Sequence, residues 1–259
     1  MLVIAHRGAS REAPENTLIA FSKAVEIGAD YIEFDIRLTN DNEIIIMHDE
    51  NTERTTGYDG LIKDMTLSEL KKLNCGNEVI DAEIPTLEEV INLKRGNTKL
   101  QIEICSLGLI EPLYSLLKKY DLMDLVFVSS FRLEELIKLQ SINPDIKLAS
   151  LHSPQPRFFE QLNPNLKSGP LQTNKPGWVL DSKYRKAIVD FAVRHKFYAI
   201  HPYFFVADEE MINYTHENNI LFSVWTVNRK ISFKKYIKMG VDGIFTDNPR
   251  LLIKLLKEI

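Results

Sequence analysis

The sequence alternates between short apolar runs and longer stretches that carry apolar residues at helical spacing. The apolar runs have the length of β-strands, and most of the stretches between them have the periodicity of amphipathic helices. Eight such runs end near His6, Asp35, Cys105, Ser130, His152, Pro202, Val227 and Asp247. Strands that are separated by helices can pair in parallel, because a parallel connection needs about a dozen residues or more. The alternation therefore predicts an α/β fold built on a parallel sheet.

The number of these units distinguishes between two parallel architectures. Eight β/α units in a chain of 259 residues have the size and pattern of a TIM (β/α)8 barrel. The alternative, a doubly wound open sheet, predicts a glycine-rich phosphate loop after the first strand. The segment after the first strand, residues 6–10, contains a single glycine, Gly8, and does not match such a loop. We therefore predict a TIM barrel that forms a single domain over residues 1–259.

One further apolar run, Glu43–His48, does not fit a parallel connection. Only Thr39–Asn42 separates it from the preceding strand, which is too short for a parallel crossover. We predict instead a hairpin extension after the second strand, with its turn near Asn40 and Asp41. Counting back from this turn places His48 near residues 34 and 35 of the partner strand.

Two long connections exceed what a minimal barrel needs. They are Asn51–Glu83, and Ser153–Ser182 with its five prolines. Connections of this length in a compact domain are usually functional or disordered. Both follow strands and would lie on the active face of a barrel, so we expect them to form walls of a substrate pocket. A loosely packed excursion without a role is an equal alternative for the second.

Ionisable residues gather at the C-terminal ends of the predicted strands. His6, His48 and Glu103 each end a strand or lie late in one, and Glu33 and Asp35 lie near the end of another. In a parallel barrel these ends form the catalytic face. Glu33 and Asp35 are two positions apart and point to the same side of their strand. Two carboxylates this close repel each other unless a cation lies between them.

This set of side chains predicts acid–base chemistry at a metal ion. All-oxygen ligation favours Mg²⁺, Ca²⁺ or Mn²⁺ over zinc. The unperturbed pKa of histidine, ~6.5, suits proton transfer near neutral pH. Such an ion can neutralise negative charge on a substrate oxygen and orient the substrate for attack. We therefore expect His6 and His48 to share the roles of general acid and general base.

Composition excludes several other classes of protein. The net charge of −4 argues against a nucleic-acid-binding protein, which normally has a basic face. The sequence has no run of ~18 apolar residues, so we expect no membrane span. No signal peptide is visible. Cys75 and Cys105 fit no metal-binding or redox spacing, which favours a cytoplasmic protein with free thiols. The sequence gives no indication of an oligomeric state.

Several short motifs occur together in one order. They are His6-Arg7-Gly8-Ala9, Pro14-Glu15-Asn16-Thr17, Glu33-Phe34-Asp35, His48-Asp49 and Glu103. In this combination the chain resembles the glycerophosphodiester phosphodiesterase family. The resemblance is close over residues 1–105. It is weaker later, at Ser129-Ser130-Phe131, Trp225-Thr226 and Phe245-Thr246-Asp247-Asn248-Pro249.

The resemblance implies a TIM barrel that cleaves a small-molecule phosphodiester into glycerol 3-phosphate and an alcohol, with a bound Ca²⁺ or Mg²⁺. It also implies a role for each residue that matches the family's motifs. These are Glu33, Asp35 and Glu103 as metal ligands, His6 and His48 as the acid–base pair, Arg7 as a phosphate contact and Trp225 as an aromatic contact near the glycerol.

The chain departs from the family pattern at Cys105. The family commonly has a lysine two residues after the third metal ligand, whereas this chain reads Glu103-Ile104-Cys105. Cys105 shares the facing of Glu103, so we expect it to line the substrate site. Loss of the lysine removes a positive charge near the phosphate. Four alternatives follow from this loss. The enzyme is less active, another basic group takes the place of the lysine, the substrate differs, or the barrel binds phosphate esters without cleaving them. We favour an active enzyme, because the other core residues are present.

A second alternative is a phospholipase D-type barrel that cleaves lysophospholipid. It needs an apolar, lipid-accessible opening, which Phe158-Phe159 and Tyr203-Phe204-Phe205 would supply. Buried aromatic packing explains the same residues equally well.

Four other polar residues receive structural interpretations. We expect Asn16 to cap a helix over Asn16–Ile27 and Asp247 to organise the turn into Pro249. His152 and His201 each end a strand, and we expect them to be hydrogen-bonded polar groups rather than catalytic residues.

Overall fold

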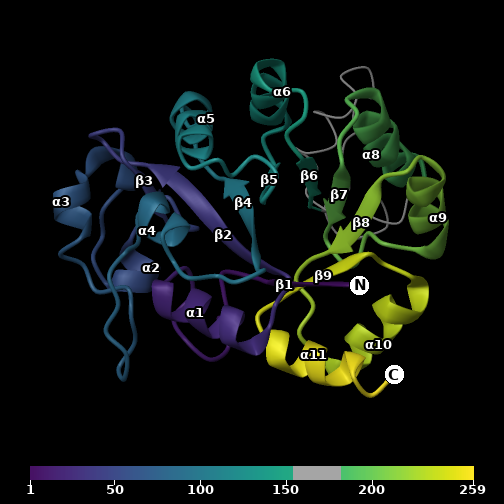
Figure 1. Ribbon diagram of the computed structural model, residues 1–259, viewed down its shortest axis with the longest axis horizontal. Helices are drawn as coiled ribbons and strands as arrows, with labels where there is room; N and C mark the ends of the chain where they lie inside the picture. Colours follow the sequence, from purple (N-terminus) through teal and green to yellow (C-terminus); the bar gives the residue numbers. More distant parts are fainter. Residues whose placement is uncertain (154–181) are drawn as a thin grey trace, which may run out of the picture.

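A closed barrel of parallel strands forms the centre of the structure (Figure 1), a computed structural model that describes residues 1–153 and 182–259. The barrel strands are β1 (Leu2–Ala5), β2 (Tyr31–Leu38), β4 (Lys99–Ile104), β5 (Val126–Ser130), β6 (Leu148–His152), β7 (Ala199–Pro202), β8 (Leu221–Val224) and β9 (Gly243–Thr246). Their order around the barrel is β1-β9-β8-β7-β6-β5-β4-β2, and the pairing of β1 with β2 closes it. The prediction of a TIM barrel is confirmed, and the open sheet is excluded.

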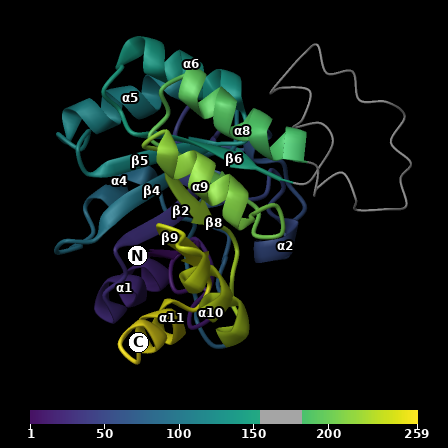
Figure 2. The ribbon, with the colours of Figure 1, turned by 90° about the vertical axis from the view of Figure 1, so that its right-hand side faces the viewer.

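Helices cover the outside of the barrel (Figures 1 and 2). They are α1 (Leu18–Ile27), α2 (Glu53–Thr56), α3 (Leu67–Leu70), α4 (Leu87–Ile91), α5 (Ile110–Lys119), α6 (Leu133–Ile142), α8 (Ser182–Arg194), α9 (Glu209–Glu217), α10 (Lys230–Met239) and α11 (Pro249–Leu256), with a 3₁₀ turn at Ile62–Asp64. The main core lies between strands and helices, where Ile32, Phe34 and Ile36 are fully buried. Because side chains alternate along β2, Glu33 and Asp35 point to the other face, into the barrel.

The start of α1 differs from the sequence prediction. Thr17, not Asn16, caps α1, because the Thr17 hydroxyl accepts a hydrogen bond from the Ala20 amide. Asn16 has a φ of 57°, and its side-chain amide donates to Asp35 Oδ2 at 2.9 Å.

The hairpin prediction is confirmed. Strand β3 (Ile44–Ile46) pairs antiparallel with β2 and lies outside the closed barrel, with Ile46 opposite Ile36. The amide of Met47 donates to the carbonyl of Asp35 at 2.9 Å. The hairpin therefore returns His48 to the neighbourhood of the β2 carboxylates.

Apolar side chains form a cluster at one end of the barrel. A small apolar cluster of Phe127, Ala149 and Ala199, with Tyr31 and Leu221 packed on it, lies at the level of the strand N-termini.

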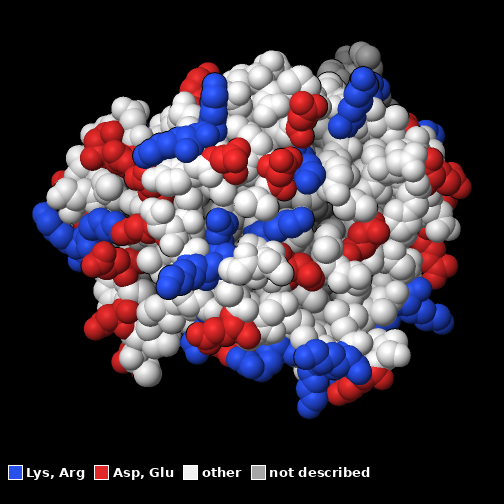
Figure 3. Space-filling model, in the orientation of Figure 1, with Lys and Arg blue, Asp and Glu red and all other residues white. Residues whose placement is uncertain are grey.

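Helix α2 follows β3 and lies on the side of the barrel opposite both chain termini (Figure 2). On the face shown in Figure 3, basic and acidic side chains are interspersed. Within the described residues, no helix is long and apolar enough to span a membrane.

Candidate active site

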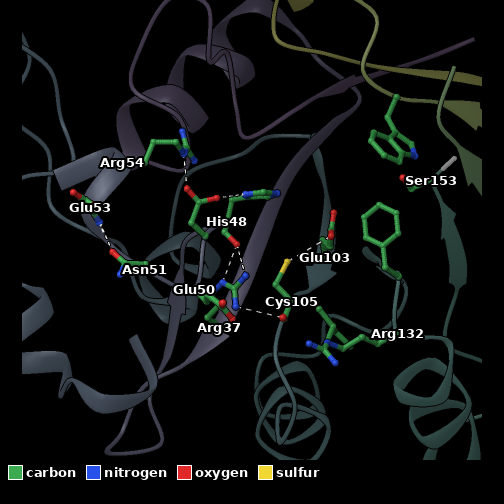
Figure 4. Close-up of a pocket in the computed structure, with 14 residues that line it drawn as sticks. Arg37, His48, Glu50, Asn51, Glu53, Arg54, Glu103, Cys105, Arg132 and Ser153 are labelled. Carbon is green, nitrogen blue, oxygen red and sulfur yellow. Dashed lines mark hydrogen bonds and ion pairs between the residues drawn. The ribbon is translucent and has the colours of Figure 1, made fainter. Parts of the chain in front are cut away.

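A pocket with a volume of about 820 Å³ opens at the C-terminal ends of the barrel strands (Figure 4). It is lined by Arg37, His48, Asp49, Glu50, Asn51, Glu53, Arg54, Glu103, Ile104, Cys105, Phe131, Arg132, Ser153 and Trp225. Four residues that the sequence analysis selected are in this list: His48, Glu103, Cys105 and Trp225. Residues of the long connection after β3 also contribute, as expected for a pocket wall. The second long connection lies outside the described residues between Ser153 and Ser182.

Three carboxylates come together on β2 and β4. Glu33 and Asp35 are almost fully buried, with 2% and 1% of their surface exposed. Asp35 lies directly opposite Glu103 in the parallel pairing of the two strands. The thiol of Cys105 is 3.5 Å from Asp35 Oδ1 and 3.5 Å from Glu103 Oε1. Ligand atoms of Asp35, Glu103 and Cys105 all lie within 4.8 Å of one another.

This carboxylate cluster has an excess of negative charge. Burial, with the charges of Asp35 and Glu103, raises the pKa of Glu33 well above its usual value. Burial and the charge of Asp35 also raise the pKa of Glu103. Arg7 offsets part of this repulsion, because its Nε is 3.4 Å from Asp35 Oδ2 and its amide donates to Glu33 Oε2 at 2.8 Å. One guanidinium does not balance three carboxylates, so the cluster favours a further cation.

The thiol of Cys105 is not suited to be a nucleophile. Burial, with the neighbouring charges of Glu103 and Asp35, raises its pKa well above the usual value. The reactive form of cysteine is the thiolate, and this thiol stays protonated at neutral pH. Cys105 therefore acts as a hydrogen-bond donor to the two carboxylates.

His6 follows β1 and is held by a carboxylate from the last strand. Its Nδ1 is 2.6 Å from Asp247 Oδ1. Asn228 and Ser10 donate hydrogen bonds to the same carboxylate. Such a carboxylate fixes the proton on Nδ1, which leaves Nε2 as the nitrogen that can exchange a proton with a substrate.

The expectation that Asp247 organises the turn into Pro249 did not include the main contact of its side chain. The side chain of Asn248, not of Asp247, caps α11 by accepting a hydrogen bond from the Leu251 amide. Asp247 binds His6 instead, and the sequence analysis missed this role. The available signal was the closure of a barrel, which places the ends of the first and last strands side by side.

His48 has the same arrangement on the other side of the site. Its Nδ1 is 2.5 Å from Asp49 Oδ1. Asp49 also pairs with Arg54, which pairs with Glu15, and Glu15 in turn accepts a hydrogen bond from Arg7 at 2.8 Å. An alternating chain of charges thus joins His48 to the guanidinium beside the carboxylate cluster.

Arg37 fixes the backbone of His48. Its Nε and Nη2 both donate to the His48 carbonyl, at 2.8 and 2.5 Å, and its Nη1 donates to the Cys105 carbonyl at 3.4 Å. The end of the hairpin is therefore tied to the end of β4.

Trp225 lies at the end of β8 and forms an aromatic wall of the pocket. Its ring centroid is 5.4 Å from that of Phe131 and 5.2 Å from that of Tyr203. Its indole nitrogen donates to the carbonyl of His201 at 2.7 Å, which fixes the ring.

The other two strand-end histidines are buried and are not among the residues that line the pocket. His152 and His201 are each only 1% exposed. His152 Nε2 is 2.8 Å from Ser150 Oγ, and the His201 ring lies between those of Phe127 and Phe245. Burial lowers the pKa of each to about 3. Both are therefore neutral at physiological pH.

The fold and the site together define a TIM-barrel enzyme with a carboxylate cluster and two aspartate-bound histidines. The model of the glycerophosphoryl diester phosphodiesterase family matches residues 6–251. The chain belongs to this family, which places it among the phosphoric diester hydrolases.

Relatives of known name cover nearly the whole chain. A glycerophosphodiester phosphodiesterase of Caldanaerobacter subterraneus subsp. tengcongensis is 36% identical over 99% of this chain and 98% of its own. One from Bacillus subtilis is 30% identical over 99% of this chain and 87% of its own. An Oleispira antarctica phosphodiesterase, solved in complex with the product sn-glycerol-3-phosphate, is 26% identical. Its TM-score is 0.82, over 99% of this chain and 97% of its own.

Proposed function

We propose that this protein hydrolyses glycerophosphodiesters to glycerol 3-phosphate and an alcohol, with one divalent cation and a histidine pair. The observation that carries the proposal is the arrangement of His6 and His48. Each has Nδ1 bound to an aspartate, Asp247 or Asp49, at the barrel end that holds the carboxylate cluster. Family membership supports the same reaction.

The donors for the cation would be Glu33, Asp35 and Glu103. These are oxygen ligands, and Mg²⁺ and Ca²⁺ are the ions that prefer them. Burial and the repulsion of neighbouring carboxylates raise the pKa values of Glu33 and Glu103, and a divalent ion would relieve this repulsion. When bound, the ion supplies positive charge to an oxygen of the phosphodiester. The protonated thiol of Cys105 borders this set without adding charge to it.

The two histidines would divide the proton transfers. One removes the proton of the nucleophile and the other protonates the leaving oxygen, each through Nε2. Asp247 and Asp49 orient the rings and stabilise the protonated form of each imidazole. The nucleophile is a water molecule or a hydroxyl of the glycerol itself. The second would make the first step intramolecular.

Two further residues would bind substrate. Arg7 extends into the carboxylate cluster and offers a guanidinium to the phosphate. Trp225 offers an apolar face to the glycerol carbons. Both assignments follow the motif positions at which this chain matches the family.

The lysophospholipid alternative keeps one observation in its favour. Phe205 is 64% exposed and its ring is 5.8 Å from that of Tyr203, which packs on Trp225. An exposed aromatic side chain near the pocket wall suits an acyl chain. Phe158 and Phe159, the other aromatic pair considered, lie outside the described residues. Activity on micellar lysolipid, with none on soluble diesters, would favour this alternative.

The test is release of glycerol 3-phosphate from several soluble glycerophosphodiesters in Mg²⁺, in Ca²⁺ and in chelator. We expect release that depends on the metal and that His6→Ala and His48→Ala each abolish. His216→Gln is the matched control, because His216 forms a similar pair with Asp242 on the outside of the barrel. Near-wild-type activity of either alanine variant would remove that histidine from the mechanism.

A further inference from the structure

A second cavity, of about 320 Å³, adjoins the active-site pocket beside Cys105. We call it the side pocket. It shares Arg37, Glu50, Cys105 and Arg132 with the main pocket, and these four lie together in Figure 4. Its other lining residues are Leu38, Thr39, Leu61, Ile62, Lys63, Ser106 and Leu107. The side pocket is thus continuous with the site where the scissile phosphate would bind.

The side pocket is positively charged. Its lining holds three cations, Arg37, Lys63 and Arg132, against one carboxylate, Glu50. None of the three cations forms an ion pair within residues 1–153 and 182–259. In this part of the chain, the hydrogen bonds of Arg37 go to the carbonyl oxygens of His48 and Cys105, which carry no full charge. Arg54, by contrast, is paired with two carboxylates, those of Glu15 and Asp49.

Cys105 connects this charge pattern to the active site. Its short side chain lines both cavities. The side chain of Arg132 extends from the end of β5 toward Cys105 and Arg37 (Figure 4). The backbone of Arg132 is held separately, since its amide donates to Ser130 Oγ at 2.9 Å. Among the described residues no carboxylate pairs with the guanidinium, so it can bind a ligand without a change in the strand end.

We propose that the side pocket binds the alcohol portion of the substrate and selects alcohols that carry a phosphate or carboxylate group. The inference rests on the proposed function, and it names the substrate class. Arginine binds phosphate and carboxylate oxygens in a two-pronged geometry, and lysine adds a point charge. Trp225 and Phe131 form the apolar wall of the main pocket, which suits the glycerol carbons instead. The substrate would then lie with its glycerol against the aromatic wall and its charged alcohol beside Arg132.

The test compares kcat/KM for three glycerophosphodiesters that differ in the charge of the alcohol portion. The alcohols are glycerol with a terminal phosphate, which is anionic, glycerol, which is neutral, and choline, which is cationic. We expect the anionic alcohol to be preferred. In Lys63→Gln/Arg132→Gln, the ratio of kcat/KM for the anionic to the neutral diester should fall about tenfold, since each partly exposed ion pair contributes modestly. The preference should also weaken at high ionic strength. Lys254→Gln on α11, an exposed basic residue far from the pocket, is the matched control.

The outcomes separate this inference from the proposed function. Turnover of all three diesters without an anionic preference, or a preference for choline through Glu50, would overturn the inference and leave the function intact. Absence of turnover would overturn the function. In that case calorimetric titration of inorganic phosphate in chelator decides whether the side pocket binds anions. Weaker binding by the double variant than by wild type would support the charged pocket, and equal binding would overturn it.

Discussion

His6 Nδ1 lies 2.6 Å from Asp247 Oδ1, although 241 positions separate the two residues in the sequence. Strands β1 and β9 are neighbours in the closed barrel, with Ala5 opposite Thr246. His6 and Asp247 are the residues that directly follow Ala5 and Thr246, so the same strand pairing brings them together. Burial alone would raise the pKa of Asp247, but hydrogen bonds from His6 and its neighbours hold it below the usual value. Asp247 is therefore ionised and able to stabilise a protonated His6.

Substitution of Asp247 tests whether this pair acts in catalysis. We expect Asp247→Asn to lower kcat by roughly 10- to 100-fold, because the imidazolium loses its counter-charge, and His6→Ala by about 10²–10⁴-fold. The change should appear in kcat more than in KM, and the acidic limb of the pH–rate profile should move. Far-ultraviolet circular dichroism checks the fold, and His216→Gln serves as the control. An unchanged pH profile in Asp247→Asn would limit Asp247 to a structural role.

Binding of a divalent ion should stabilise the fold. An ion that relieves the repulsion among Glu33, Asp35 and Glu103 binds the folded state and not the unfolded one. At about 100 times Kd this contributes about 2.7 kcal/mol, which corresponds to a rise in Tm of roughly 5–10 °C for a domain of this size. We expect Mg²⁺ or Ca²⁺ to raise the Tm measured by calorimetry. The rise should be largely lost in Glu103→Gln and kept in Glu53→Gln, an exposed acid at the pocket rim. An equal rise in both variants would place the ion elsewhere.

The two thiols should react slowly in the folded protein. Burial raises the pKa of Cys75 to about 11 and, with the charges of Glu103 and Asp35, raises that of Cys105 well above its usual value. Because the thiolate is the reactive form, we expect modification by a disulfide reagent at pH 7.5 to be at least about tenfold slower than in denaturant. Cys75→Ser isolates the signal of Cys105. Rapid reaction of that single thiol in the folded protein would contradict the assignment of Cys105 as a protonated donor.

Acid should destabilise the protein through its two buried histidines. Each has a pKa of about 3 when folded and ~6.5 when unfolded. Between these values the unfolded state binds more protons, so the free energy of unfolding falls as the pH falls below ~6.5, by about 1 kcal/mol per histidine per pH unit. Urea unfolding of His152→Gln between pH 7 and pH 5 should show a shallower loss than wild type, and His216→Gln the same loss as wild type. Parallel curves for His152→Gln and wild type would show that His152 is protonated within the fold.

Much of the barrel could be predicted because local patterns determine it. Short apolar runs such as Val126–Ser130 have the length of buried strands, and the intervening helices permit parallel connections. The four-residue connection before Glu43 permits only a hairpin, and this fixes His48 near Asp35. Closely spaced carboxylates on one strand indicate a shared site, because residues i and i+2 point to the same face. These inferences depend on chain length and side-chain period, which are properties of the sequence itself.

Other features depend on contacts between residues that are distant in the sequence. The role of Asp247 exists only because the barrel closes. Asn16 looks like a helix cap locally, but its bond to Asp35 draws it out of that position and leaves Thr17 as the cap. The side pocket joins Arg37, Lys63 and Arg132 from three separate segments, and no local pattern connects them. The period of the side chains and the length of each segment are enough to predict the strands and the residues that meet at their ends. Which of those residues touch depends on the whole fold, because closure of the barrel and packing of its connections set the distances between them.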